Sequence, residues 1–170
     1  MHKFYLFIVV LIITGCNTEN STTSKQEYLR WVGDIEFDSA LDDPIFKLCN
    51  GESNVKQYFN FSQGLQYDGE KKSINDDFKL KYKPVESEDS GLVRVRFIVN
   101  CKGKTDRFRI IGMDNNFIEK EFDALIIDQL IGITKELKGW KILPNSEQAQ
   151  DYYQYLIFKI DKGNIIEILP

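Results

Sequence analysis

Residues 91–112 read GLVRVRFIVNCKGKTDRFRIIG, and in two parts of this stretch apolar and polar side chains alternate. A period of two is typical of a strand with one face in the core, because successive side chains of a strand point to opposite faces. The apolar set of the first part is Val93, Val95, Phe97, Val99 and Cys101, and that of the second is Phe108, Ile110 and Gly112. Lys102 and Gly103 lie between the two parts. The stretch therefore predicts a β-hairpin.

A two-residue loop at Lys102-Gly103 would also fix the register of this hairpin. Such a loop pairs Phe97 with Phe108, Val95 with Ile110, and Arg96 with Arg109. Both strands then place their apolar sets on the same face, so the register is self-consistent.

Further elements flank the hairpin. Helical spacing of apolar residues predicts a helix over 74–82, which Pro84 would end. A second helix is expected over 122–137, with N-cap groups at Asp114, Asn115 and Asn116 and with Gly139 as its stop. Two strands are expected at residues 152–160 and 165–169, joined by a turn at Lys162-Gly163-Asn164. We expect residues 27–46 to be irregular, and residues 53–67 fit either a short helix or a strand. The fold class expected is α+β, with an antiparallel sheet of three to four strands and helices packed on one face.

The N-terminus has the pattern of a secretory signal peptide. Lys3 precedes the apolar run 4–13, which is about half the ~20 residues that a transmembrane helix needs. The sequence Ile13-Thr14-Gly15-Cys16 that follows resembles the lipobox of bacterial lipoproteins. That resemblance implies a diacylglycerol on the Cys16 thiol and a cut before Cys16. An ordinary secreted protein with a cysteine there by chance is the alternative.

This pattern predicts the organisation of the chain. Residues 1–15 would be the removed signal peptide, 16–26 the lipidated cysteine and a flexible tether, and 27–170 a single domain. The protein would sit in the bacterial cell envelope, bound to the membrane by its lipid. Asn17 replaces the Asp that resembles an inner-membrane retention signal, so the outer membrane is favoured over the inner membrane.

Composition excludes several functions. The chain has 22 basic and 26 acidic side chains, a net charge of −4, which argues against nucleic acid and against charge-driven docking on anionic lipid. The single histidine, His2, lies in the segment expected to be removed. Catalysis by Ser-His-Asp or Cys-His and histidine-bearing zinc sites are thereby excluded. We expect no enzyme, no catalytic residue, no cofactor and no metal.

Two cysteines remain once Cys16 is modified, Cys49 and Cys101. An even pair in an oxidising compartment predicts a disulfide. Because the alternation places Cys101 with the inward-facing set, its partner is expected to arrive over the core side of the hairpin. Two separately buried free thiols are the alternative.

The order of these elements resembles the C-terminal domain of TonB-family energy transducers. The matching residues are 91–99 with Gly103, the amphipathic helix, Gly139-Trp140 and Pro144, within a part of the chain from about 70 to 170. The resemblance implies two helices against one face of a three-stranded antiparallel sheet, which binds an extended peptide by adding a strand at the sheet edge. Unlike an energy transducer, this chain lacks a retained transmembrane helix and a proline-rich rod. The energy-coupling role is therefore not carried over.

Four arginines, Arg94, Arg96, Arg107 and Arg109, are the candidate binding residues. All four would lie on the outer face of the hairpin, where like charges opposite each other need compensation. Neighbouring acidic groups, such as Glu167, or aromatic rings could compensate them, or an anionic ligand could. Tyr152, Tyr153 and Tyr155 could similarly stack on sugars or simply be strand residues.

Two function classes follow. The first is a non-enzymatic binding or adaptor module that docks an envelope protein or an extended peptide at a sheet edge. The alternative is an inhibitor or immunity-type lipoprotein, which a protruding acidic loop at residues 86–89 would favour. The oligomeric state stays open.

Overall fold

The computed structural model describes residues 33–57, 65–144 and 149–169, and from Asp34 onward the chain forms one compact unit. The expectations for the signal peptide, for Cys16 and for the tether lie outside the described residues. Neither helix in the described part combines the length and the apolar character that crossing a bilayer requires.

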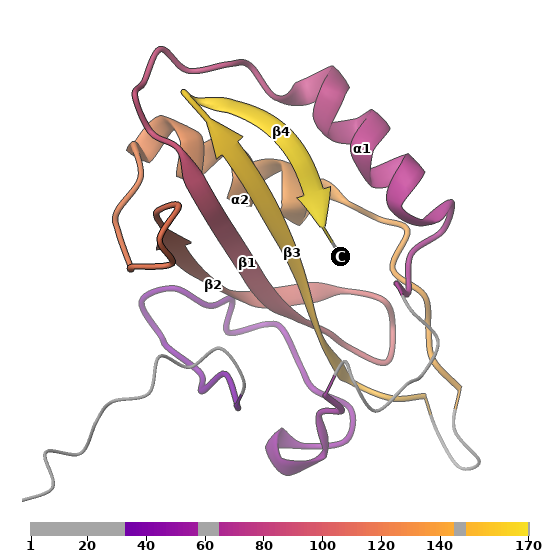
Figure 1. Cartoon of the computed structure of the whole chain (residues 1–170). Coiled ribbons are helices and arrows are strands. Elements are labelled where there is room, and N and C mark those ends of the chain that lie inside the picture. The colour runs from indigo at the N-terminus through magenta and orange to yellow at the C-terminus, as the bar shows by residue number, and fades with distance from the viewer. Residues whose placement is uncertain (1–32, 58–64, 145–148, 170) are drawn as a thin grey trace, which may run out of the picture. The chain divides into compact units, whose positions relative to one another are not determined.

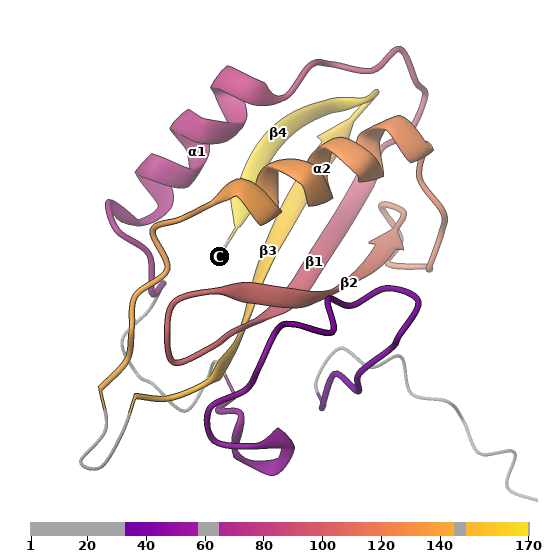
Figure 2. The same cartoon turned by 180° about the vertical axis from the view of Figure 1, so that it is seen from behind.

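The fold is α+β, and its sheet has four antiparallel strands in the order β2-β1-β3-β4. The elements in chain order are the 3₁₀ turn η1 (Glu52–Asn54), α1 (Glu70–Lys81), β1 (Gly91–Val99), β2 (Thr105–Met113), α2 (Ala124–Glu136), β3 (Tyr152–Asp161) and β4 (Asn164–Leu169). Both helices lie on the same face of the sheet, behind it in Figure 1 and in front of it in Figure 2. The expected fold class is thus confirmed, and β2 and β4 are the two edges.

The hairpin register is confirmed over most of its length and wrong near the turn. Arg96 pairs with Arg109 as expected, but the register then shifts, and Ile98 pairs with Asp106. Arg107 takes a positive φ of 59° at this bulge. The turn is also longer than two residues, because the Asn100 N–H donates to the Lys104 carbonyl, 2.8 Å away. An extra residue in β2 absorbs the difference in length.

The two helices form where the apolar spacing predicts, but α2 is capped differently. Its N-cap is Asp123, whose carboxylate accepts the Leu125 N–H at 2.8 Å. The expected cap at Asp114 is wrong, because the Asp114 carboxylate instead closes a turn by accepting the Ile118 N–H at 2.9 Å. The helix ends at Glu136, before Gly139, with Leu137 in an extended conformation.

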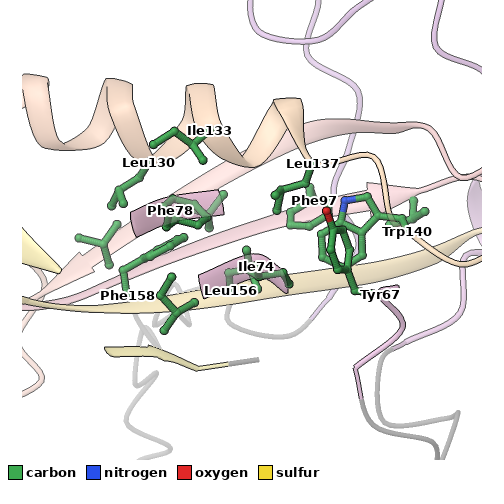
Figure 3. Close-up of a cluster of buried hydrophobic side chains, with 14 of the residues drawn as sticks. Tyr67, Ile74, Phe78, Phe97, Leu130, Ile133, Leu137, Trp140, Leu156 and Phe158 are labelled. Carbon is green, nitrogen blue, oxygen red and sulfur yellow. The ribbon is translucent and has the colours of Figure 1, made fainter. Parts of the chain in front are cut away.

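The main core lies between the helices and the sheet (Figure 3). Phe78 of α1 packs on Phe158 of β3 with ring centroids 4.8 Å apart, and Trp140 packs on Phe97 at 5.1 Å. The β1 residues of this face have no exposed surface, since strands cover both edges of β1 and helices cover its face. Burying this apolar surface is the main favourable term in folding.

The opposite face of the sheet carries a second, smaller core. Ile35 and Val55 pack there against Ile98 of β1 and Tyr153 of β3. Lys56 adds an isolated parallel bridge to Tyr152, at the beginning of β3. Residues 34–57, which are irregular apart from η1, therefore form a strap over the face that the helices leave uncovered; we call residues 34–57 the strap.

Asp151 holds this strap to the hairpin. Its carboxylate has no exposed surface, and one oxygen accepts the Cys101 N–H at 2.9 Å. The other oxygen accepts the N–H groups of Cys49 at 2.8 Å and of Asn50 at 2.7 Å, together with the Asn50 side-chain amide at 3.1 Å. A buried carboxylate requires such donors, because desolvating it without them is costly.

The expected disulfide joins the same residues. Cys49 and Cys101 are bonded, with their Cα atoms 6.0 Å apart. The expected route over the core side is wrong, however, because the strap that carries Cys49 packs on the face of Ile98 and Tyr153. Cys101 lies in the turn, beyond the last residue of β1, so the alternation of the strand no longer fixes the direction of its side chain.

We predict that Asp151→Ala lowers the free energy of unfolding by about 3 kcal/mol or more, because three backbone N–H groups lose the buried carboxylate that accepts them. Urea unfolding of the oxidised protein measures this change. Asp128→Ala is the control, since Asp128 is exposed on α2 and should alter stability by less than about 0.5 kcal/mol. A loss at Asp151 no larger than that of the control would contradict the role given to this carboxylate.

Candidate functional site

The four arginines lie on the strap side of the sheet, and two of them are held by strap carboxylates. Arg107 donates from both terminal nitrogens to Glu52, at 2.5 and 2.6 Å, and also to the Ile35 carbonyl. Arg109 donates in the same two-pronged way to Asp42, at 2.7 and 2.8 Å. Such paired bonds are the strongest arrangement that a guanidinium offers a carboxylate.

The other two arginines stack on tyrosines of β3. The guanidinium carbon of Arg94 lies 4.5 Å from the centre of the Tyr155 ring, and that of Arg96 lies 4.4 Å from the centre of the Tyr153 ring. Arg96 also donates to the Gln57 side chain at 3.2 Å. These are favourable cation–π contacts. Both arginines are buried. Each therefore covers one face of a tyrosine ring, Arg94 that of Tyr155 and Arg96 that of Tyr153.

These contacts set the charge states of the face. The hydrogen bonds from Arg109 hold the pKa of Asp42 below its ordinary value, and those from Arg107 do the same to the pKa of Glu52. Burial lowers the pKa of Arg94 and of Arg96. An anionic ligand would have to displace Asp42 and Glu52 to reach Arg109 and Arg107. Glu167, which was expected as a possible partner of these arginines, instead has its carboxylate 3.6 Å from the Lys71 ammonium group.

The two edges of the sheet differ in how they are covered. Beside β2, Glu119 forms a bridge with Met113, and the Lys120 N–H donates to the Gly112 carbonyl at 3.0 Å. The strap also contacts this strand through Asp43, whose N–H donates to the Asp106 carboxylate. Residues 119–120 and the strap therefore both lie along β2.

The β4 edge is open. Apart from its pairing with β3, no backbone hydrogen bond joins residues 165–169 to any other described residue. Ile166 is 57% exposed, although it lies in a strand next to the half-buried Ile165. A strand edge with free N–H and C=O groups is a template for pairing with another chain.

A groove runs along this edge, between β4 and α1, which lie side by side in both views of the fold (Figures 1 and 2). Its volume is about 170 Å³. The helix side is formed by Asn75, Phe78, Lys79 and Tyr82, and the strand side by residues 164–168. Pro84 also lines the groove. The groove thus combines an unpaired backbone edge with an apolar wall.

The acidic stretch 86–89 is held by hydrogen bonds at both ends. The Val85 N–H donates to the Gly163 carbonyl at 3.2 Å, and the Gly163 N–H donates to the Asp89 carbonyl at 3.1 Å. The Asp89 carboxylate accepts from Lys120 and from the Asp123 N–H. Only the side chains of Glu86 and Glu88 are exposed, so this stretch lies along the β3–β4 turn.

Cys49, Cys101 and Asp151 bring their ligand atoms within 4.8 Å of one another, as a metal site would. Here the two sulfurs are bonded to each other, and both carboxylate oxygens accept N–H groups. The arrangement is therefore that of a structural link.

Compared with protein-family models, curated proteins and solved structures, the chain gives no match. The functional argument consequently rests on the geometry of the arginine face and of the β4 groove. The groove was not found from the sequence, although residues 165–169 as a final strand were a signal for a sheet edge.

We predict that acid weakens the fold partly through Asp42. Since its folded-state pKa lies below the ordinary 3.8, its pairing with Arg109 stabilises the fold above that pH and is lost as the pH falls through the lower value. Asp42→Asn should therefore flatten the fall in unfolding free energy below about pH 4.5. Urea unfolding at a series of pH values measures the slope.

Burial raises the pKa of Asp106, which gives a slope of the opposite sign, but Asp106 is present in both proteins and its contribution largely cancels in the comparison. Equal slopes for the wild-type protein and for Asp42→Asn would show that the Arg109 pair does not act in this way.

Proposed function

We propose that this protein is a non-enzymatic binding module that takes up an extended peptide of a partner protein along β4. The observation that carries the proposal is the open backbone edge of β4 beside the groove of α1. Strand addition at such an edge takes its affinity from main-chain hydrogen bonds and its specificity from pockets for alternate side chains. The resemblance to the TonB C-terminal domain supports the same mode of binding.

The groove suits an apolar side chain on the incoming strand. Phe78 and Ile168 are buried at its base, while Ile165 and Tyr82 are partly exposed along it. An apolar side chain that enters here extends the main core, because Phe78 and Ile168 belong to it. A peptide with alternating apolar residues would therefore pair with β4 through its backbone and fill the groove on one side.

We further propose that the partner is an envelope protein and that Cys16 carries a lipid anchor. The lipobox-like sequence supports the anchor, and the Cys49–Cys101 bond supports an oxidising compartment, where disulfides persist. Two or three acyl chains on one cysteine suffice for stable attachment to a membrane.

A photoreactive amino acid in place of Ile166 tests the peptide site. In cells, it should form a covalent adduct with a partner, because an added strand would lie against this side chain. The same amino acid in place of Ile45 is the control, since Ile45 is 81% exposed but belongs to the strap. Adducts from position 45 with none from position 166 would contradict binding at β4.

Replacing Cys16 by Ser tests the anchor. The variant should accumulate as an uncut chain without lipid, and mass spectrometry of the N-terminus together with membrane fractionation should show this. The wild-type chain should begin at an acylated Cys16. A mature wild-type chain that begins elsewhere and carries no lipid would exclude the anchor.

A further inference from the structure

Four lysines gather at the turn end of the hairpin. Lys102 and Lys104 belong to the β1–β2 turn, and Lys138 and Lys141 to the chain that leaves α2; all four are exposed. A Cβ placed on Gly103 would lie 3.0 Å from the Trp140 carbonyl oxygen and 3.8 Å from Ile142, so the two segments touch. They run side by side in both views of the fold (Figures 1 and 2). We call these four residues the lysine patch.

The lysine patch is not neutralised by the described part of the chain. None of its four ammonium groups forms an ion pair or a side-chain hydrogen bond with another described residue. Three of the four lysines of α1 differ, because Lys71, Lys72 and Lys81 each lie within 4.0 Å of a carboxylate. The nearest acids on these segments are Asp68, whose N–H donates to the Gly139 carbonyl, and Glu136, whose carboxylate pairs with Lys81.

An exposed apolar residue, Ile142, lies among these lysines. Ile142 is 55% exposed and lies next to Gly103. The patch holds separate ammonium charges rather than guanidinium groups, and Arg107 and Arg109, which could grip a phosphate with two bonds, are occupied by Glu52 and Asp42. Dispersed lysines around an apolar side chain fit a broad anionic surface better than a single bound anion.

The compact unit also begins near this end of the sheet. The Ile35 N–H donates to the Tyr153 hydroxyl at 3.2 Å, and Tyr153 follows Tyr152, the partner of Val99 at the end of β1. The chain between Cys16 and Asp34 can span at most about 60 Å. A lipid on Cys16 would therefore allow this end of the domain to reach the membrane surface.

We propose that the lysine patch docks the domain on a membrane surface rich in anionic phospholipid. The net charge of −4 opposes such docking on average, but the patch concentrates positive charge at one end. The rest of the molecule would then be turned away from the negative surface. The inference requires neither the peptide groove nor the lipid anchor, so it stands or falls separately from both.

Co-sedimentation with lipid vesicles tests the proposal. The chain from residue 16 onward, with Cys16 replaced by Ser, keeps the compact unit whole and carries no lipid. It should bind vesicles in which a third of the phosphatidylcholine is replaced by phosphatidylglycerol, and it should not bind pure phosphatidylcholine. Raising the salt to about 1 M should abolish binding, because the Debye length falls to about 3 Å.

Lys102→Glu with Lys104→Glu should lower the partition coefficient at least about twentyfold, since each lysine near an anionic surface contributes about fivefold. Lys83→Glu with Lys162→Glu is the matched control, because it changes the net charge equally at two exposed lysines outside the groove, and Lys162 lies in the β3–β4 turn at the opposite end of the sheet. An equal loss in both variants, equal binding to neutral vesicles, or no binding to the anionic vesicles would each overturn the proposal.

Discussion

The buried Asp151 carboxylate decides how the strap, the hairpin and β3 are held together. It accepts the backbone N–H groups of Cys49, Asn50 and Cys101, and Asp151 comes directly before the first residue of β3. Three parts of the chain that are distant in sequence thus meet at one buried charge. A charge in this position must be fully hydrogen-bonded, and the bonds that satisfy it also bring the two cysteines within reach of each other. The disulfide and the carboxylate therefore hold the strap at the same point.

Fixing the strap decides which surfaces remain for binding. With the strap in place, Asp42 and Glu52 neutralise Arg109 and Arg107, and Ile98 and Tyr153 are buried. One face of the sheet is then closed by the strap and the other by the helices. The β4 edge keeps its outer backbone groups free, and the lysine patch keeps its charge. The proposed peptide site and the proposed membrane contact are thus two surfaces of the described residues that the internal pairing leaves unused.

The sequence predicted what depends on local periodicity. The strands at 91–99 and 152–160, the helix before Pro84 and the class of the fold follow from side-chain alternation and from turn residues. It failed where a distant group decides: the bulge at Arg107, the cap at Asp123 and the face on which Cys49 arrives. The acids that pair with Arg107 and Arg109 lie 55 and 67 residues away, and no local pattern identifies them. The net charge likewise gave no sign of the lysine patch, because it is a sum over the whole chain and does not show where the charges lie.

Amide hydrogen exchange of the oxidised, unliganded protein, followed residue by residue by NMR, tests the central claim that Asp151 closes the strap face and leaves β4 open. We expect the amides of Cys49, Asn50 and Cys101 to exchange as slowly as those of β1. We also expect fast-exchanging amides on the outer edge of β4. Fast exchange at the three Asp151-bound amides, together with slow exchange along all of β4, would contradict this claim.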